Sequence, residues 1–247
     1  MLLGSNSVLA AIGEENGLIR PYLREVTLKA GQVLCEPGDA IRHVWFPGSG
    51  AISKLMTFED GSEIECALIG REGAVGAASV LGLRRAVTRD VCHVEARAWR
   101  MEAARLVDAC SASPHAKEVI ERYLARKLCV AIRNGACNAC HSVEQRLSRW
   151  LLTCSDVLET NEIALPQDLL AKMLGVQRTS VNPTLRALQA AGAVAVGRSR
   201  VTIRDRDVLI GHACECYRAM RCEEALSGEL PRAEPMADWA AARARPI

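Results

Sequence analysis

The segment from Gln167 to Arg204 constrains the fold of this chain more than any other part of the sequence. Apolar residues repeat with helical spacing in two runs, 169–174 and 181–188. Gly175 between them is the residue type that most readily ends a helix. After a second glycine, valine and isoleucine residues flank the turn at 197–200, which predicts a two-stranded hairpin. Two short helices around a glycine turn, followed by a hairpin, predict a winged helix-turn-helix.

Positive charge is concentrated in the same segment. Six lysines and arginines but only one acidic residue, Asp168, lie between residues 165 and 204, whereas the whole chain of 247 residues has a net charge of +2. Phosphate attraction depends on local positive charge, and the second helix also begins with the polar run 177–180. These features favour DNA binding over the alternative, a helical hairpin that contacts no nucleic acid.

The bulk composition limits the remaining possibilities. The chain is long enough for one large or two small domains, and a hydrophobic content of 49% excludes a wholly disordered protein. No run of 18 or more apolar residues appears, and the N-terminus lacks the basic and apolar regions of a signal peptide. We therefore expect a cytoplasmic protein without a membrane partner.

Upstream of the helix-turn-helix the pattern changes. Residues 5–24 predict a short helical lead-in. From residue 24 to residue 100, short apolar runs alternate with turn signals about every ten residues, the rhythm of a β-sandwich or barrel. Within this region, 52–56 and 64–68 flank the turn Glu59-Asp60-Gly61 and predict a β-hairpin.

A long helix is predicted to begin near Ala116. Its apolar residues form a narrow stripe, which suits pairing with a second copy of the same helix. The alternative is a helix that lies on its own β-domain, and the sequence leaves both open. The stripe consists of Ile120, Leu124, Leu128 and Ala131.

The order of β-barrel, long helix and winged helix-turn-helix resembles the Crp/Fnr family of bacterial transcription regulators. The matching segments are residues 31–55, 60–76, 141–152 and 167–194. The resemblance implies an α+β fold with an N-terminal β-barrel, a cupin-like double-sheet jelly roll of the cyclic-nucleotide-binding kind. The implied divisions are a sensor barrel with its N-terminal helix at 1–110, a dimerisation helix at 111–136, the DNA-binding domain at 137–220 and a disordered tail at 221–247.

The same resemblance implies a homodimer on a near-palindromic operator, with RNA polymerase and an unknown small-molecule effector as further partners. Two recognition helices would enter successive major grooves about 34 Å apart. By position, Arg178 and Thr179 would face base edges, and Gln177 and Ser180 would hold phosphates. The expected DNA-contacting set is Gln177, Arg178, Thr179, Ser180, Asn182, Arg186, Arg198 and Arg200.

One residue departs from the family pattern. Pro183 lies about two turns into the recognition helix, on the face that carries Thr179 and Arg186 and opposite the apolar stripe. Proline removes the amide that would bond the carbonyl of Thr179 and crowds that carbonyl. We expect either a bent helix or readout through the first turn and Arg186, and in both cases altered sequence discrimination.

The expected effector pocket also departs from the family. Members that bind cyclic nucleotides hold the ribose with a glutamate after a glycine and hold the phosphate with an Arg-Ser pair. The corresponding positions here are Gly76, Ala77 and Ala78, then Ala86 and Val87. Because a buried phosphate without a cationic partner is costly, we do not expect a cyclic nucleotide.

The eleven cysteines add two motifs. Cys137, Cys140 and His141 form the C-x-x-C-H pattern of covalent haem attachment, and Cys214 and Cys216 follow His212. Two close thiol pairs could bind zinc or oxidise reversibly, but we expect packing cysteines, with no metal site and no haem, iron–sulfur or zinc cofactor.

No pattern of catalytic residues is evident, so we expect no enzyme. Two alternatives to a transcription regulator stay open. One is a haem or redox protein that uses the motif at 137–141. The other is a ligand-binding module with a degenerate DNA domain, for which Pro183 is the argument.

Overall fold

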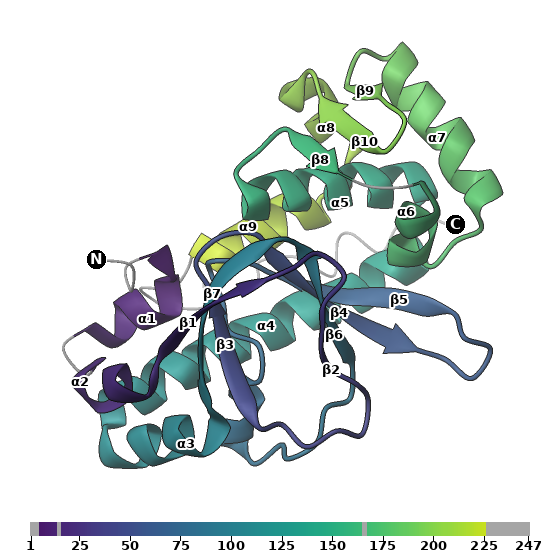
Figure 1. Cartoon of the computed structure of the whole chain (residues 1–247). Coiled ribbons are helices and arrows are strands. Elements are labelled where there is room, and N and C mark those ends of the chain that lie inside the picture. Colours follow the sequence, from purple (N-terminus) through teal and green to yellow (C-terminus); the bar gives the residue numbers. More distant parts are fainter. Residues whose placement is uncertain (1–4, 14–15, 165–166, 226–247) are drawn as a thin grey trace, which may run out of the picture.

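The structure is a computed structural model that describes residues 5–13, 16–164 and 167–225. It has a β-rich N-terminal part, one long helix across its back and a smaller helical part with a three-stranded sheet (Figure 1). Short helices precede the first strand, as expected: α1 (Ser7–Ile12), α2 (Asn16–Ile19) and the 3-10 helix η3 (Arg20–Tyr22). Among the described helices, none is both long and apolar enough to cross a lipid bilayer.

Two antiparallel sheets form the N-terminal part and confirm the predicted double-sheet jelly roll. The first has the order β1-β7-β3 and the second the order β2-β6-β4-β5. Phe46, Ile52 and Met101 are among the largest side chains buried between the layers and the surrounding helices. The strands are β1 (Arg24–Leu28), β2 (Val33–Cys35), β3 (His43–Pro47), β4 (Ala51–Thr57), β5 (Glu63–Ile69), β6 (Arg89–Val94) and β7 (Ala96–Glu102), with the 3-10 helix η4 (Ala77–Leu81) between β5 and β6.

The predicted hairpin at 52–68 is confirmed. Strands β4 and β5 pair antiparallel with Met56 opposite Ile64. Gly61 closes the turn with φ +77°, and its amide donates to the carbonyl of Phe58 at 3.0 Å. A left-handed backbone of this kind favours glycine, which is why this turn could be located from the sequence.

The long helix is α4 (Pro114–Cys140), which follows α3 (Ala103–Ala112) and extends four residues beyond the expected end at 136. Ser113 caps it by accepting a hydrogen bond from the amide of Ala116 at 3.0 Å. Its first half lies on the β-domain of the same chain, where Ile120 is fully buried and the Tyr123 hydroxyl donates to the carbonyl of Ala74 at 3.0 Å.

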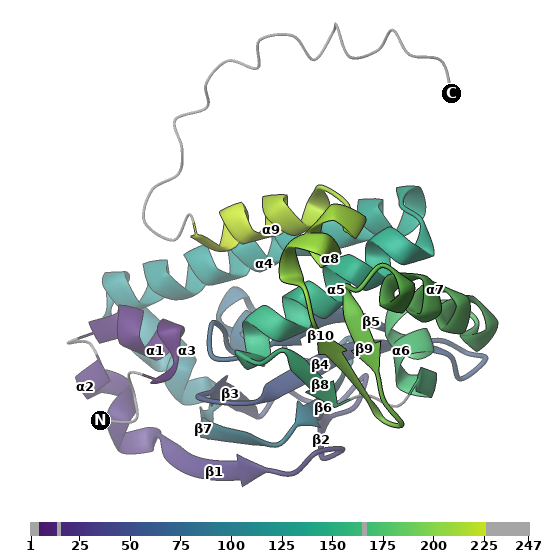
Figure 2. The same cartoon turned by 90° about the horizontal axis from the view of Figure 1, so that it is seen from above.

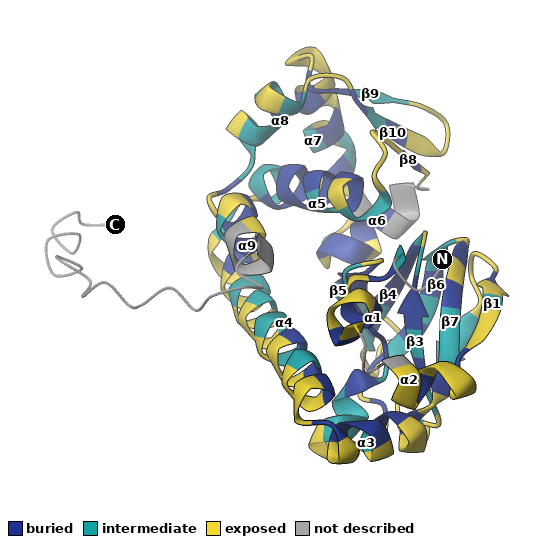
Figure 3. Cartoon of the chain, turned by 90° about the vertical axis from the view of Figure 1, so that its left-hand side faces the viewer, coloured by how far each residue is buried: buried dark blue, intermediate teal, exposed yellow. Residues whose placement is uncertain are grey.

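This packing corrects the predicted dimerisation stripe. Ile120 belongs to the core of its own chain and Leu124 is half-buried against that core, so neither offers a free surface. Leu128 and Ala131 are exposed, and Ile132, absent from the predicted stripe, is exposed as well. Much of the outward side of α4 is exposed in the single chain (Figure 3). Only the second half of the helix therefore has an apolar face toward solvent.

The DNA-binding part has the predicted helices and wing around a common core. Helix α5 begins with a capping box between Ser142 and Gln145 and buries Leu147, Trp150 and Leu151. The sheet order is β8-β10-β9, so an additional strand, β8, joins the wing and buries Ile163. The elements are α5 (Val143–Leu158), β8 (Glu162–Ala164), α6 (Gln167–Leu174), α7 (Arg178–Ala190), β9 (Val194–Val196), β10 (Arg200–Ile203) and α8 (Arg206–His212).

A final helix, α9 (Cys216–Ala225), lies alongside α4 (Figure 2). The expected disordered tail from residue 221 is therefore wrong for 221–225, which form the end of this helix. Residues 226–247 lie outside the described residues. Tyr217 and Met220 bury the inner face of α9, so the helix belongs to the folded structure.

Candidate DNA-binding site and effector cavity

The helix-turn-helix forms because two apolar faces pack against each other around Gly175. Val181, Leu185 and Leu188 of α7 are all buried, as predicted from their spacing. Leu170 and Met173 of α6 are buried on the opposing face. Gly175 has φ +61°, a conformation that costs a residue with a Cβ about 1–2 kcal/mol. Glycine therefore suits the turn between α6 and α7.

The opposite face of α7 is open to solvent. Thr179, Pro183 and Arg186 are exposed on this face, and Ser180 and the N-cap residue Gln177 are exposed at the start of the helix. Their side chains supply hydroxyl, amide and guanidinium groups, which suit phosphates and base edges. The face thus has the shape and chemistry that a recognition helix needs.

Helix α7 continues without interruption through Pro183. One residue later, the Thr184 hydroxyl donates to the carbonyl of Ser180 at 2.8 Å. The carbonyl of Ser180 thus gains a hydroxyl partner. It lies next to the carbonyl of Thr179, which has no helical amide partner because Pro183 lacks an N–H. The exposed ring of Pro183 leaves the middle of the recognition face without a hydrogen-bond donor.

Other residues of the expected DNA-contacting set differ in how they are placed. Asn182 is half-buried, and its Oδ1 is enclosed without a partner among the described atoms, so it points toward the protein. Arg198 is exposed at the tip of the wing, whereas Arg200 forms an ion pair with Glu162 of β8 at 2.6 Å. The side chain of Arg178 lies outside the described residues.

The DNA-binding part packs against the β4–β5 hairpin of the N-terminal jelly roll. The side chain of Ile64 on β5 lies so close to Gly175 that an added Cβ there would meet its Cδ1 at 2.8 Å. Lys172 of α6 approaches Glu63 of β5 at 3.5 Å. The turn between the two helices of the DNA-binding motif is thus in direct contact with the sensor hairpin.

Glu65 lies at the centre of this contact. The Trp150 indole donates to one oxygen of its carboxyl group at 2.7 Å, and the Ser53 hydroxyl donates to the other at 2.7 Å. Burial raises the pKa of Glu65 above its ordinary value of 4.5, although these two hydrogen bonds and the charge of Arg149 oppose the shift. Glu65 is a junction residue that the sequence did not single out.

A cavity of about 520 Å³ lies between the jelly roll and α4. All five residues of the expected effector pocket line it: Gly76, Ala77, Ala78, Ala86 and Val87. From α4, Tyr123, Leu124 and Ala131 complete the wall. The five positions therefore lie around one cavity, and the long helix forms part of its boundary.

Of the described residues, three lysine and arginine side chains line this cavity; Lys54 and Lys127 are paired with carboxylates, and the third, Arg42, is exposed. Lys54 is held by both oxygens of Asp90 at 2.7 and 2.8 Å, and Lys127 pairs with Glu72 at 2.9 Å. Burial, together with the charges of Arg100 and Arg42, lowers the pKa of His43 below 6.5. Arg84, Arg85 and Arg89, the arginines nearest in sequence to Ala86 and Val87, do not line the cavity. Within the part of the chain that the structure describes, the lining therefore offers a compact anion one unpaired cation, Arg42, and not an enclosed pair of cations.

The two cysteine motifs come together in an arrangement that was not expected. Cys137 and His141 lie beside Cys214 and Cys216, whereas Cys140 is exposed and outside the cluster. His212 instead contacts Glu144 at 2.7 Å through its Nδ1. The haem motif is therefore split between the buried cluster and the surface.

The surroundings of the first of these cysteines ease the ionisation of its thiol. Burial opposes ionisation of Cys137, but the charge of Arg149 and hydrogen bonds from His141 and Cys214 lower the pKa of this thiol below 9.0. The same contact with Cys137 raises the pKa of His141 above 6.5.

Several solved structures share the fold. FixK2 of Bradyrhizobium japonicum is 15% identical with a TM-score of 0.68, covering 78% of this chain and 98% of that chain. A putative transcriptional regulator of the Crp/Fnr family from Eubacterium rectale is 17% identical with a TM-score of 0.68, covering 87% and 99%. The c-di-GMP responsive global regulator CLP of Xanthomonas campestris is 17% identical with a TM-score of 0.66, covering 77% and 98%. No curated protein matches the sequence.

The sequence matches family models for both parts of the chain. Residues 25–113 match the cyclic nucleotide-binding domain, and residues 145–211 match the Crp-like helix-turn-helix domain. The first match covers the jelly roll and the second covers the helix-turn-helix with its wing. With both domains present in the order that its members share, the chain belongs to the Crp/Fnr family, a family of transcription regulators and not of enzymes.

Proposed function

We propose that this regulator acts as a homodimer on a near-palindromic operator and responds to an effector other than cyclic AMP or cyclic GMP. The observation that carries the DNA-binding part is the open face of α7, where Thr179 and Arg186 are exposed while the opposite face is buried. Two such helices would enter major grooves one helical turn apart.

The proposed dimer forms through the second half of α4. Leu128 and Ile132 lie one helical turn apart on this helix and are 62% and 65% exposed. Ala125, Gly135 and Ala139 continue the exposed small or apolar positions at spacings of three and four residues. Such spacing is the pattern of two helices that pack side by side, and a second copy of this face is its simplest partner.

The cavity is the proposed effector site. Because Leu124 and Ala131 line the cavity while Leu128 faces solvent one turn away, an effector would contact the same helix that forms the proposed dimer. The alanines and valine at 77, 78, 86 and 87 offer apolar surface and no charge. A neutral or weakly charged ligand of moderate size fits this lining.

Isothermal titration of the full chain with cyclic AMP and cyclic GMP tests the effector part of this proposal. We expect no saturable heat at ligand concentrations that saturate cyclic-nucleotide receptors, because Lys54 and Lys127 of the described cavity wall are already paired with carboxylates and leave a phosphate only the exposed Arg42. Saturable binding that Ala77→Trp in the cavity wall abolishes would contradict the proposal.

Mapping of genomic binding sites, followed by affinity measurements on one of them, tests the DNA part. We expect a near-palindromic site, and we expect Arg186→Ala to weaken binding by about 1–3 kcal/mol. Arg97→Ala is the matched control, since this exposed arginine lies on β7 and pairs with Glu25 far from α7. Absence of salt-dependent binding to any genomic site would instead support a ligand-binding module with a degenerate DNA domain.

The effect of Pro183 can be measured in the same system. We expect Pro183→Arg and Pro183→Ala to change the preferred operator sequence, because both restore the helical amide and the arginine adds a donor on the groove-facing side. Selection from a random DNA library with each variant would report the change. An unchanged target preference in both variants would show that this position does not influence readout.

A further inference from the structure

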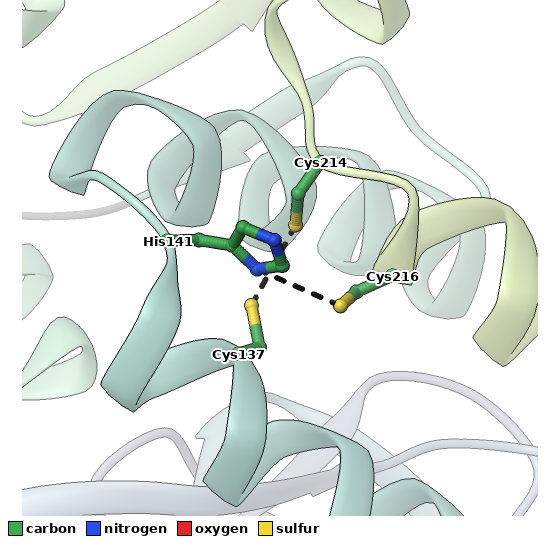
Figure 4. Close-up of side chains that lie close together, drawn as sticks. All are labelled: Cys137, His141, Cys214 and Cys216. Atoms are coloured by element: carbon green, nitrogen blue, oxygen red, sulfur yellow. Dashed lines mark hydrogen bonds between the residues drawn. The ribbon is translucent and has the colours of Figure 1, made fainter. Parts of the chain in front are cut away.

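Four side chains with metal-ligating atoms converge where α4 ends and α9 begins (Figure 4). Cys137 and His141 lie one helical turn apart at the end of α4, and Cys214 and Cys216 lie at the junction of α8 and α9. Their ligand atoms all lie within 4.8 Å of one another. The three cysteines are buried, and none of the four lines the effector cavity or the DNA-binding face.

The spacing of these atoms matches the coordination shell of a single ion. Zinc bonds of about 2.3 Å to sulfur and about 2.0 Å to nitrogen place tetrahedral ligands roughly 3.5–3.8 Å apart. The Sγ atoms of Cys137 and Cys214 are 3.6 Å apart, and Cys216 Sγ lies 3.7 Å from His141 Nδ1. Ligands of an iron–sulfur cluster surround several irons and therefore need a wider arrangement.

The orientation of the imidazole points to the same role. Nδ1 of His141 faces the sulfurs, while its Nε2 lies 3.2 Å from the carboxylate of Glu215. Metal-bound histidines commonly donate their second ring N–H to a carboxylate, which fixes the tautomer and the ring plane. Glu215 thus lies where the hydrogen-bond acceptor of a metal-bound histidine is expected.

Two buried arginines give an independent reason to expect negative charge in the cluster. Arg146 and Arg149 of α5 are 9% and 6% exposed, and neither forms a salt bridge within the described part of the chain. The Nε atoms of both have no hydrogen-bond partner among the described atoms. Arg149 interacts with Cys137 directly. A divalent ion held by three thiolates has a net negative charge, which compensates such cations, whereas three neutral thiols do not.

We propose that Cys137, His141, Cys214 and Cys216 bind one Zn²⁺ as a closed tetrahedral structural site that ties α9 to the end of α4. The three thiols ionise on binding and release their protons to solvent, so no oxidant or reductant is required. Four protein ligands leave no open position, which is the property of a structural rather than a catalytic zinc. This site replaces the expectation that these cysteines only fill space.

The proposed zinc site lies at the connection between α4 and the DNA-binding part. Helix α5, the first helix of the DNA-binding part, begins at Val143, two residues after His141. The ion would therefore hold the connection between the proposed dimer helix and the DNA-binding part in one conformation, with α9 as the second point of attachment. Loss of the ion would release that connection.

Metal analysis of the purified full chain tests the proposal. After removal of loosely bound metal by a weak chelator, we expect about one zinc per chain in the unaltered protein and in Cys140→Ser. Cys140 is the matched control because it is an exposed cysteine next to His141. We expect Cys214→Ser and Cys216→Ser to retain at least tenfold less zinc. Stoichiometric iron, a Cys137–Cys214 disulfide in the freshly isolated protein, or equal zinc in all variants would overturn the assignment.

A second measurement does not depend on whether the variants fold. Addition of Co²⁺ to the metal-free unaltered protein should give the intense visible bands of a tetrahedral cobalt–thiolate centre, and Zn²⁺ should remove them. Weak bands typical of octahedral cobalt would overturn the proposal. Because neither measurement involves DNA or an effector, the site stands or falls separately from the proposed function.

The contribution of Glu215 to zinc affinity can be measured separately. We expect Glu215→Gln to lower zinc affinity by about tenfold, the lower end of the range for outer ligand partners, because Glu215 is mostly exposed. Competition with a chromophoric chelator measures the change. An affinity equal to that of the unaltered protein would show that Glu215 does not support the histidine.

Discussion

Replacing Leu128 and Ile132 together with glutamate is expected to convert the protein into a monomer. Both side chains are more than 60% exposed in the single chain, so the charges cost little in the monomer but would face each other across the proposed dimer. A dimer binds both half-sites of a palindrome with two linked recognition helices, whereas a monomer binds one half-site. Loss of the second contact lowers the apparent affinity by about 10²–10⁴-fold. Analytical ultracentrifugation and fluorescence anisotropy on the mapped operator measure the two effects.

The matched control for this prediction is the double exchange Glu118→Arg and Arg122→Glu. These residues form an exposed ion pair of 2.6 Å on the same helix, so the exchange keeps the charge balance and the pairing. We expect the control to remain dimeric and to bind the operator normally. If the glutamate variant also remains a dimer, the contact between subunits lies elsewhere.

The second large effect concerns Glu65, at the contact between the two domains. Because burial raises its pKa, the carboxyl group is protonated in the folded protein at pH values where the unfolded chain is already ionised. Its contribution to stability is thus complete below pH 4.5 and is lost as the pH rises through the raised pKa. Each unit of pKa shift corresponds to about 1.4 kcal/mol.

Glu65→Gln removes this loss. The glutamine oxygen can still accept from the Trp150 indole, and its amide can donate to the Ser53 hydroxyl. We therefore expect the variant to unfold at a higher temperature than the unaltered protein, with a difference that grows as the pH rises above 4.5. Glu25→Gln on the exposed strand β1 serves as the control with no such trend. A constant difference across the pH range would contradict the assignment.

Local patterns in the sequence predicted much of the fold. The buried stripe of α7 follows from Val181, Leu185 and Leu188, whose spacing fits only one face of a helix. The β4–β5 hairpin follows from Gly61, because the turn needs a left-handed residue. In both cases the information lies within a few residues of the structure that it determines, so pattern alone was enough.

Features that depend on distant contacts were missed or assigned incorrectly. The stripe on α4 was continuous, but whether Ile120 faces its own barrel or a second chain depends on where that barrel lies. Strand β8 is three residues long and is stabilised mainly by pairing with β10. The cysteine cluster joins Cys137 and Cys214 across 77 residues, so neither half contained the whole ligand set.

The contact between Trp150 and Glu65 also means that tryptophan fluorescence can report on the contact between the two domains. The Trp150 indole donates to Glu65, and its ring lies edge-on to that of His93 with the ring centroids 6.4 Å apart, whereas Trp45 lines the cavity between the jelly roll and α4. Indole fluorescence depends on the polarity around the ring. A ligand in the cavity would therefore change the emission of Trp45, and a separation of the domains would change the emission of Trp150. The single variants Trp45→Phe and Trp150→Phe, each of which keeps the other of these two indoles, would assign one emission change to ligand binding in the cavity and the other to movement of the DNA-binding part.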